Sequence, residues 1–299
     1  MAPYYFVRVG ATQTNELLDI GRACSPFFGR HKITIMFVHG DSCYSTETLT
    51  FHDAAFNSVS CYLITMHGSA RRDHYMEQLK KYRPCKTVVI LHNPGFRVCS
   101  KGPGVHTPAH DLWHANQHIM RIVSNDPRPV LILEDDVEFT DVFRERARDV
   151  ESFIAQRGVD AFNLGFMPFV SYPWRGHLYS VMSADAHAII YTMSGRRKIA
   201  DMPIKWLHDL EVSIHLNMYA PHTPMAVQRK VSTENSKGWN VFGIPLAYYD
   251  AFSGPESYYN GQHHMGQCGG IVSIASLVLV VLVALIVIIA HLRRSRPSP

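Results

Sequence analysis

The chain has 299 residues, of which 46% are hydrophobic and 18% charged, and its formal net charge is +4. This length is enough for one large domain or two small ones with a full hydrophobic core. The basic residues are scattered and partly terminal, and so small a net charge does not argue for nucleic-acid binding.

The chain begins with an extension, residues 1–57, whose structure the sequence leaves uncertain apart from one strand-like run at 33–38. A regular alternation of strand and helix starts at residue 58. We predict strands at 60–66, 86–91, 130–133 and 161–165, and helices at 72–82, 108–123 and 141–156. This order predicts an α/β domain over residues 58–252, with a parallel or mixed sheet flanked by helices.

Three consecutive acids follow the predicted strand 130–133. The strand is too apolar to be exposed, whereas Glu134, Asp135 and Asp136 are too charged to be buried unpaired. The acids are therefore expected at the sheet edge, where open α/β sheets bind ligands. The pattern favours a site for a hard divalent cation, with Asp136 as the best ligand. The alternative is that the acids complement the dipole of the following helix.

The C-terminal region predicts a membrane anchor. Residues 271–290 contain no charged side chain, and 20 helical residues span roughly 30 Å, the thickness of the bilayer core. We predict a juxtamembrane linker at 253–270, one transmembrane helix at 271–292 and a basic tail at 293–299.

The side of the membrane on which the domain lies is left open by two cues that disagree. The basic tail argues for a cytosolic C-terminus and a lumenal domain, but no signal peptide precedes the domain. We expect an endomembrane location, in the ER or Golgi, with the lumenal side favoured. The cysteines, five of them in the first hundred residues, fit either disulfides in a lumenal domain or reduced thiols.

Four blocks along the chain carry a family resemblance. They are 62–66 with Arg71 and Arg72, 110–113, 131–137, and 188–194 followed by Asp209 and by 225–228. In this order they resemble glycosyltransferase family 25, the lipopolysaccharide-type and procollagen galactosyltransferases. The resemblance covers about residues 59–236. One departure is that the family's Gly-Cys before Ser-His is replaced by residues 105–109.

The resemblance implies a GT-A-type fold, a nucleotide-sugar donor such as a UDP-hexose (galactose or glucose), and an acceptor that is a glycan, a protein or a lipid. It also implies a Mn²⁺ or Mg²⁺ ion, which would neutralise the charge that develops on the leaving diphosphate.

The expected roles at the site are as follows. Asp136 and Glu134 are candidate metal ligands, and Asp135 and Glu134 are candidate donor-binding residues. Either Arg71 or Arg72 is expected to contact the donor's phosphate or base.

An inverting transferase also needs a base to take the acceptor's proton. Asp209 is the first candidate and Glu211 the second. His222, in the loop 221–224, is a candidate additional metal ligand.

Two other functions remain open. His110, His114 and His118 recur every four residues on the predicted helix 108–123, and such a stripe can bind zinc in a metal-dependent hydrolase. The altered segment 105–109 instead suggests a catalytically inactive, membrane-anchored binding protein on the same fold.

Overall fold

A computed structural model describes residues 43–156, 158–165, 167–184, 186–203, 208–229 and 281–282. All of them belong to Lys32–Pro299, the larger of the chain's two compact units. The predicted strand 33–38, the linker 253–270, the basic tail and nearly all of the predicted span 271–292 lie outside these residues. Within them, no helix combines the length and hydrophobicity needed to cross a bilayer.

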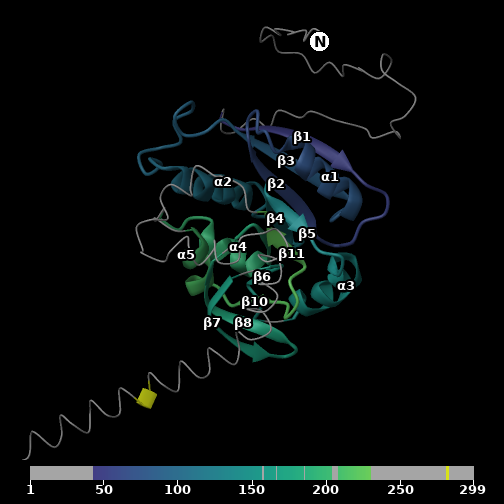
Figure 1. Cartoon of the computed structure of the whole chain (residues 1–299). Coiled ribbons are helices and arrows are strands. Elements are labelled where there is room, and N and C mark those ends of the chain that lie inside the picture. The colour runs from purple at the N-terminus through teal and green to yellow at the C-terminus, as the bar shows by residue number, and fades with distance from the viewer. Residues whose placement is uncertain are drawn as a thin grey trace, which may run out of the picture. The chain divides into compact units, whose positions relative to one another are not determined.

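A mixed nine-stranded sheet runs through the described domain (Figure 1). Its order is β1 (Ser45–Thr50), β3 (Thr87–Asn93), β2 (Ser60–Met66), β4 (Val130–Glu134), β9 (Ala188–Tyr191), β6 (Ala161–Asn163), β10 (Met218–Ala220), β8 (His177–Ala184) and β7 (Met167–Trp174). Strands β3, β2 and β4 are mutually parallel, whereas β1 and β9 run antiparallel to their neighbours. The expected mixed sheet is confirmed, and β1 extends it into the segment before residue 58.

Helices cover both faces of this sheet. Residues of α1 (Arg72–Tyr82) and α3 (Phe143–Ile154) pack into one hydrophobic core, and residues of α2 (Pro108–Ile122), α4 (Met193–Ile199) and α5 (His208–His215) pack into the other. The bounds of β2 and α1 agree with the prediction, and the other predicted elements differ by only a few residues at their ends. These elements carry clear apolar periodicity, which explains the agreement.

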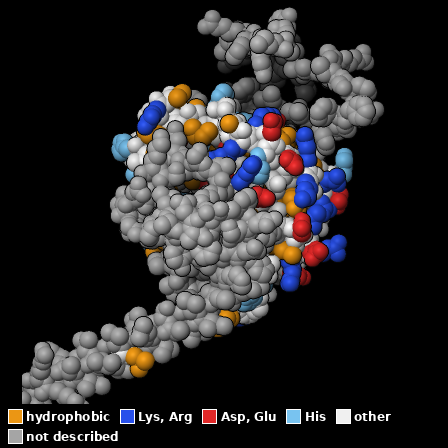
Figure 2. All heavy atoms as spheres, viewed as in Figure 1, with side chains coloured by type: hydrophobic (Ala, Val, Ile, Leu, Met, Phe, Trp, Pro, Cys, Tyr) orange, Lys and Arg blue, Asp and Glu red, His pale blue; other side chains and the backbone are white. Residues whose placement is uncertain are grey.

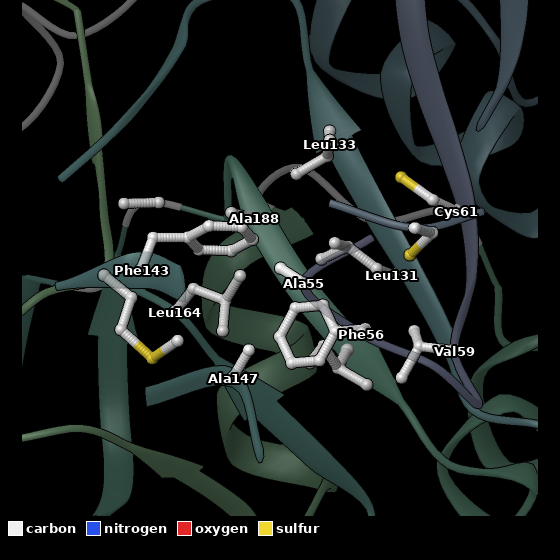
Figure 3. Packing of buried hydrophobic residues seen from close by; sticks show 14 of the residues in the cluster. Ala55, Phe56, Val59, Cys61, Leu131, Leu133, Phe143, Ala147, Leu164 and Ala188 are labelled. Atoms are coloured by element: carbon white, nitrogen blue, oxygen red, sulfur yellow. The ribbon is translucent and has the colours of Figure 1, made fainter. Parts of the chain in front are cut away.

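Strand β4 divides its side chains between the two cores. Leu131 and Leu133 pack toward α1 and α3, whereas Val130 and Ile132 pack toward α2. Figure 3 shows Leu131 and Leu133 beside Phe56 and Phe143 in the first core. All four apolar residues of β4 are at least 98% buried, which fixes the strand and holds the acids at its carboxyl end.

The segment that departs from the family pattern forms the start of α2. The side chain of Thr107 accepts a hydrogen bond from the backbone N–H of His110 at 3.1 Å, and Pro108 occupies the first turn. Both features stabilise a helix N-terminus. The altered residues therefore have a structural role here.

A separate two-stranded ladder brings a distant segment to the end of β4. Strand β5 (Val137–Phe139) pairs antiparallel with β11 (Ala226–Gln228), and Val137 lies opposite Gln228. Gly165 allows this approach, because a Cβ at this position would lie 1.6 Å from the carbonyl oxygen of Ala226. The ladder places Gln228 beside the acids after β4.

Candidate active site at the end of strand β4

Asp135 is held by three donors from the end of β2 and the segment that follows it. The hydroxyls of Thr65 and Ser69 donate to its Oδ2 at 2.8 and 2.9 Å, and Arg71 Nη1 donates to its Oδ1 at 2.6 Å. Asp135 is 93% buried, so these charge-assisted bonds offset the cost of removing its carboxylate from water. It forms a turn with Asp136 between β4 and β5.

Among the described residues, one carboxylate oxygen of Asp136 has no hydrogen-bond partner. Its Oδ2 accepts a hydrogen bond from Gln228 Nε2 at 3.1 Å and lies 3.5 Å from Arg71 Nη1. Its Oδ1 is buried and makes no hydrogen bond. Burial raises the pKa of Asp136 and neighbouring Asp135 adds to the rise, while Gln228 and Arg71 oppose it. A buried acceptor of this kind favours a cation or donor placed against it.

The two adjacent arginines have different partners. Arg71 bridges Asp135 and Asp136, whereas Arg72 donates two hydrogen bonds to Glu47, each at 3.0 Å. A hydrogen bond from His92, together with Arg72, lowers the pKa of Glu47 to about 2 against the opposing effect of burial. The structure thus brings Arg71, and not Arg72, to the acidic turn.

Glu134 and Asp209 lie in another environment, near β9. The backbone N–H of Glu134 donates to the carbonyl of His187 at 2.9 Å, which continues the pairing of β4 with β9. Burial raises the pKa of Tyr191, and the carboxylates of Asp209 and Glu134 raise it further. Asp209, the expected base, and Glu134, the first acid of the triplet, therefore both raise the pKa of Tyr191.

The second candidate base is paired along its own helix. Glu211 Oε2 lies 3.2 Å from His215 Nε2, one turn further along α5. Asp209 Oδ1 lies 3.6 Å from Nδ1 of the buried His208.

His222 is not brought to the acidic turn. Gln228, at one end of the β5–β11 ladder, contacts Asp136. The loop that contains His222 joins the opposite end, where Thr140 Oγ1 donates to the carbonyl of Pro224. The pKa of His177 is lowered mainly by burial, and His222 lowers it further.

The histidine stripe of α2 packs against Tyr44. The Tyr44 hydroxyl is hydrogen-bonded to His114 Nδ1 at 2.7 Å, and its ring stacks on His118 with centroids 4.4 Å apart. Across the described ranges, no three His, Cys, Asp or Glu side chains form a group that could hold a metal by themselves. The geometry therefore gives no support to a zinc hydrolase built on this stripe.

The acidic turn nevertheless fits a cation that also contacts a substrate. Mg²⁺ in nucleotide sites retains several waters and is held by one or two carboxylates together with substrate phosphates. Asp136 Oδ1 supplies a buried, unpartnered carboxylate oxygen of this kind. A full cage of protein ligands is not needed for such an ion.

Three residues of the site were given no role by sequence reasoning. Thr65 ends a predicted strand that is parallel to β4, which was a usable signal, because the carboxyl ends of parallel strands meet at one edge. Gln228 falls in a block that carries the resemblance, but only the pairing of β5 with β11 shows its contact. Ser69 has no distinguishing sequence pattern.

A disulfide joins Cys43, just before β1, to Cys99 in the loop after β3. Among the described cysteines, Cys61 and Cys85 are free and buried. In the same loop Lys101 is buried and pairs with Asp111 of α2.

Side chains of both charge signs lie on the visible part of the described surface. Figure 2 shows basic and acidic side chains intermingled over α1 and α3.

Comparison with known proteins gives limited information. No family model matches the chain, and no curated protein matches it. Among solved structures, a glycosyltransferase involved in the glycosylation of the major capsid of PBCV-1 is 11% identical, with a TM-score of 0.27 over 46% of this chain and 62% of that one. The apo form of mouse xyloside xylosyltransferase 1 is 12% identical, with a TM-score of 0.29 over 54% of this chain and 64% of that one. The chain thus spans less than two thirds of either protein, and scores this low establish no shared fold.

Proposed function

We propose that this domain is a GT-A-like, inverting glycosyltransferase that moves a hexose, galactose or glucose, from a UDP-type nucleotide sugar to a glycan, protein or lipid acceptor. The observation that carries the proposal is the turn after β4, where buried Asp136 keeps a free carboxylate oxygen while Arg71 and Gln228 hold the other. The order of sequence blocks around this turn supports the same function.

The turn has the chemistry needed to hold a donor diphosphate through Mn²⁺ or Mg²⁺. Asp136 would hold the ion, and the bound ion would neutralise the charge on the diphosphate as the sugar leaves. Arg71 fixes the turn by bonding both aspartates, and Asp135 is oriented by Thr65 and Ser69. A preorganised site needs little rearrangement when charge develops on the leaving diphosphate.

Asp209 is the proposed general base, with Glu211 as the second candidate. The acceptor O–H proton passes to the Asp209 carboxylate as the acceptor oxygen bonds to the sugar's anomeric carbon. The bond from that carbon to the diphosphate oxygen breaks, and its electron pair leaves with the diphosphate. Glu134 is proposed to contact the sugar; its carboxylate and that of Asp209 both raise the pKa of Tyr191.

We further propose that the domain lies in an oxidising compartment, anchored by the span 271–292 in an endomembrane. The Cys43–Cys99 disulfide supports this side of the membrane, because disulfides persist in the ER lumen and outside cells and are rare in the cytosol. Protease treatment of sealed microsomes tests it: a protected domain is expected, and a digested domain contradicts the lumenal orientation.

A donor screen tests the proposed activity. The full chain in detergent is incubated with UDP-hexoses and Mn²⁺, and release of UDP is measured with and without acceptors. Turnover is expected to require the metal and to be lost in Asp136→Ala. The matched control is Arg72→Ala, which removes a neighbouring charge outside the turn and should remain active.

The same measurements also distinguish the transferase from the inactive binding protein and from the hydrolase. Metal-dependent binding of a UDP-sugar without turnover would favour the inactive binding protein. Stoichiometric zinc that is lost in His114→Ala but retained in Asp136→Ala would favour the hydrolase. If the chain neither binds nor turns over any UDP-hexose, the transferase proposal is refuted.

A further inference from the structure

Several buried polar groups on the α2 and α5 side of the sheet have no hydrogen-bond partner within the described part of the chain. They are the indole Nε1 of Trp113, the hydroxyl of Tyr191 and both ring nitrogens of His208. Each of these residues is at least 95% buried. An unsatisfied buried polar atom destabilises the fold, so several together in one layer require an explanation.

Contacts join Trp113, His208 and Asp209, and Tyr191 belongs to the same hydrophobic core as Trp113. The rings of Trp113 and His208 meet edge to face with centroids 4.8 Å apart, and His208 Nδ1 lies 3.6 Å from Asp209 Oδ1. The carboxylates of Asp209 and of Glu134, which ends β4, both raise the pKa of Tyr191. We call Trp113, Tyr191, His208, Asp209 and Glu134 the β9 polar cluster. In this cluster Tyr191 lies opposite Val130 at the start of β4, and Glu134 ends that strand next to the acidic turn.

The chemistry of the β9 polar cluster selects a class of ligand. The Trp113 indole only donates, the carboxylates only accept when ionised, and the Tyr191 hydroxyl and the His208 ring can do both. An anion would be repelled by Asp209 and Glu134. The described residues hold no group of His, Cys, Asp or Glu that could bind a metal by itself. Neutral hydroxyl groups, which donate and accept at one atom, match this mixed set.

We infer that the β9 polar cluster binds hydroxyl groups of the donor's sugar ring, through Trp113, Tyr191 and His208, beside the diphosphate site at Asp136. This inference rests on the proposed function and deepens it by assigning the residues that recognise the sugar. Tyr191 and His208 are specificity-determining residues in this assignment. A hydroxyl-binding site discriminates strongly against a ligand that lacks the hydroxyl, because its buried polar groups are then left unpaired.

The test separates binding of the sugar from binding of the nucleotide. The full chain is titrated calorimetrically with UDP and with a panel of UDP-hexoses, all with Mn²⁺, and the ratio of the two affinities measures the contribution of the sugar. Tyr191→Phe removes one hydroxyl and keeps the ring. His208→Phe keeps ring packing on Trp113 and removes both nitrogens. Tyr82→Phe is the matched control, because Tyr82 is also buried but donates to Asp141 on the opposite side of the sheet.

We expect the wild-type chain and Tyr82→Phe to bind at least one UDP-hexose more tightly than UDP. In Tyr191→Phe and His208→Phe this advantage should fall by roughly three- to tenfold, the value of a lost neutral hydrogen bond, while UDP affinity is unchanged. The inference is overturned if the wild type shows no such advantage, or if both variants retain it or lose UDP affinity equally. Failure of the wild type to bind any uridine nucleotide would instead refute the proposed function itself.

Discussion

Replacing Arg71 with alanine should destabilise the domain far more than replacing Arg72 beside it. Arg71 Nη1 lies 2.6 Å from Asp135 and 3.5 Å from Asp136, and these two carboxyl side chains are only 10% and 3% exposed. Without the guanidinium, two adjacent buried carboxylates lose their common cation. Removing one partner of a buried ion pair typically costs about 3–5 kcal/mol.

The expected loss for Arg71→Ala is somewhat smaller, about 2–3 kcal/mol, because Thr65 and Ser69 still donate to Asp135 and the Arg71 side chain is itself 25% exposed. For a domain of about 200 residues this lowers the melting temperature by about 4–12 °C. Arg72 is 48% exposed, so solvent screens its pair with Glu47. Arg72→Ala should cost about 0.2–1 kcal/mol.

The difference in stability is measured directly from the melting temperatures of both variants, recorded at neutral pH by circular dichroism. Addition of Mn²⁺ and UDP should raise the melting temperature of Arg72→Ala as it does for the wild type, and should raise that of Arg71→Ala less. Equal melting temperatures for the two variants would show that Arg71 does not hold the acidic turn, and the proposed site would lose its positioning residue.

Three further outcomes follow from the same geometry. Asp136→Asn should stabilise the unliganded domain at neutral pH while it removes metal-stimulated activity. The pKa of Asp136 is raised, so its ionised form costs stability above that pKa, and the gain should vanish at low pH; an unchanged melting temperature at neutral pH would argue against this. Glu47 has its pKa lowered to about 2, chiefly by His92, so its stabilising effect is complete above about pH 4.5 and is lost as the pH falls toward 2. In Glu47→Gln, acid titration should show a shallower loss of stability through this window, and parallel curves would contradict the assignment. Gly165→Ala should displace β11, since a Cβ would lie 1.6 Å from the Ala226 carbonyl, and should reduce both stability and UDP-hexose binding; a variant with wild-type affinity would show that β11 is not needed at the site.

The strongly periodic elements could be predicted from the sequence because their signals are local. Strand β2 and helix α1 have the predicted bounds, and the acids after residue 133 lie at a sheet edge as burial energetics require. Strands β1, β5, β7, β8, β9, β10 and β11 were not predicted, and the reason is clearest for β10 and β11. Each has only three residues, and its pairing partner lies far away in the sequence, so no local pattern identifies it.

The partners of the site residues, like the short strands, could not be predicted from local sequence patterns. Two adjacent arginines are equivalent in sequence, and only the turn after β2 directs Arg71 to Asp135 while Arg72 faces Glu47 on β1. The histidine spacing on α2 was read correctly as a stripe. Tyr44, which contacts His114 and His118, comes from a segment some 70 residues away.

The sequence by itself determined that an apolar strand ends in three acids within an α/β alternation, because burial and periodicity are properties of neighbouring residues. Only the tertiary structure decided which oxygen of the triplet has no partner among the residues that the structure describes. That outcome depends on Gln228, brought to Asp136 by the β5–β11 ladder, and on Arg71, brought by the parallel pairing of β2 with β4. Hydrogen bonds between side chains distant in the sequence depend on how strands pair and pack, and that geometry exists only after the chain has folded.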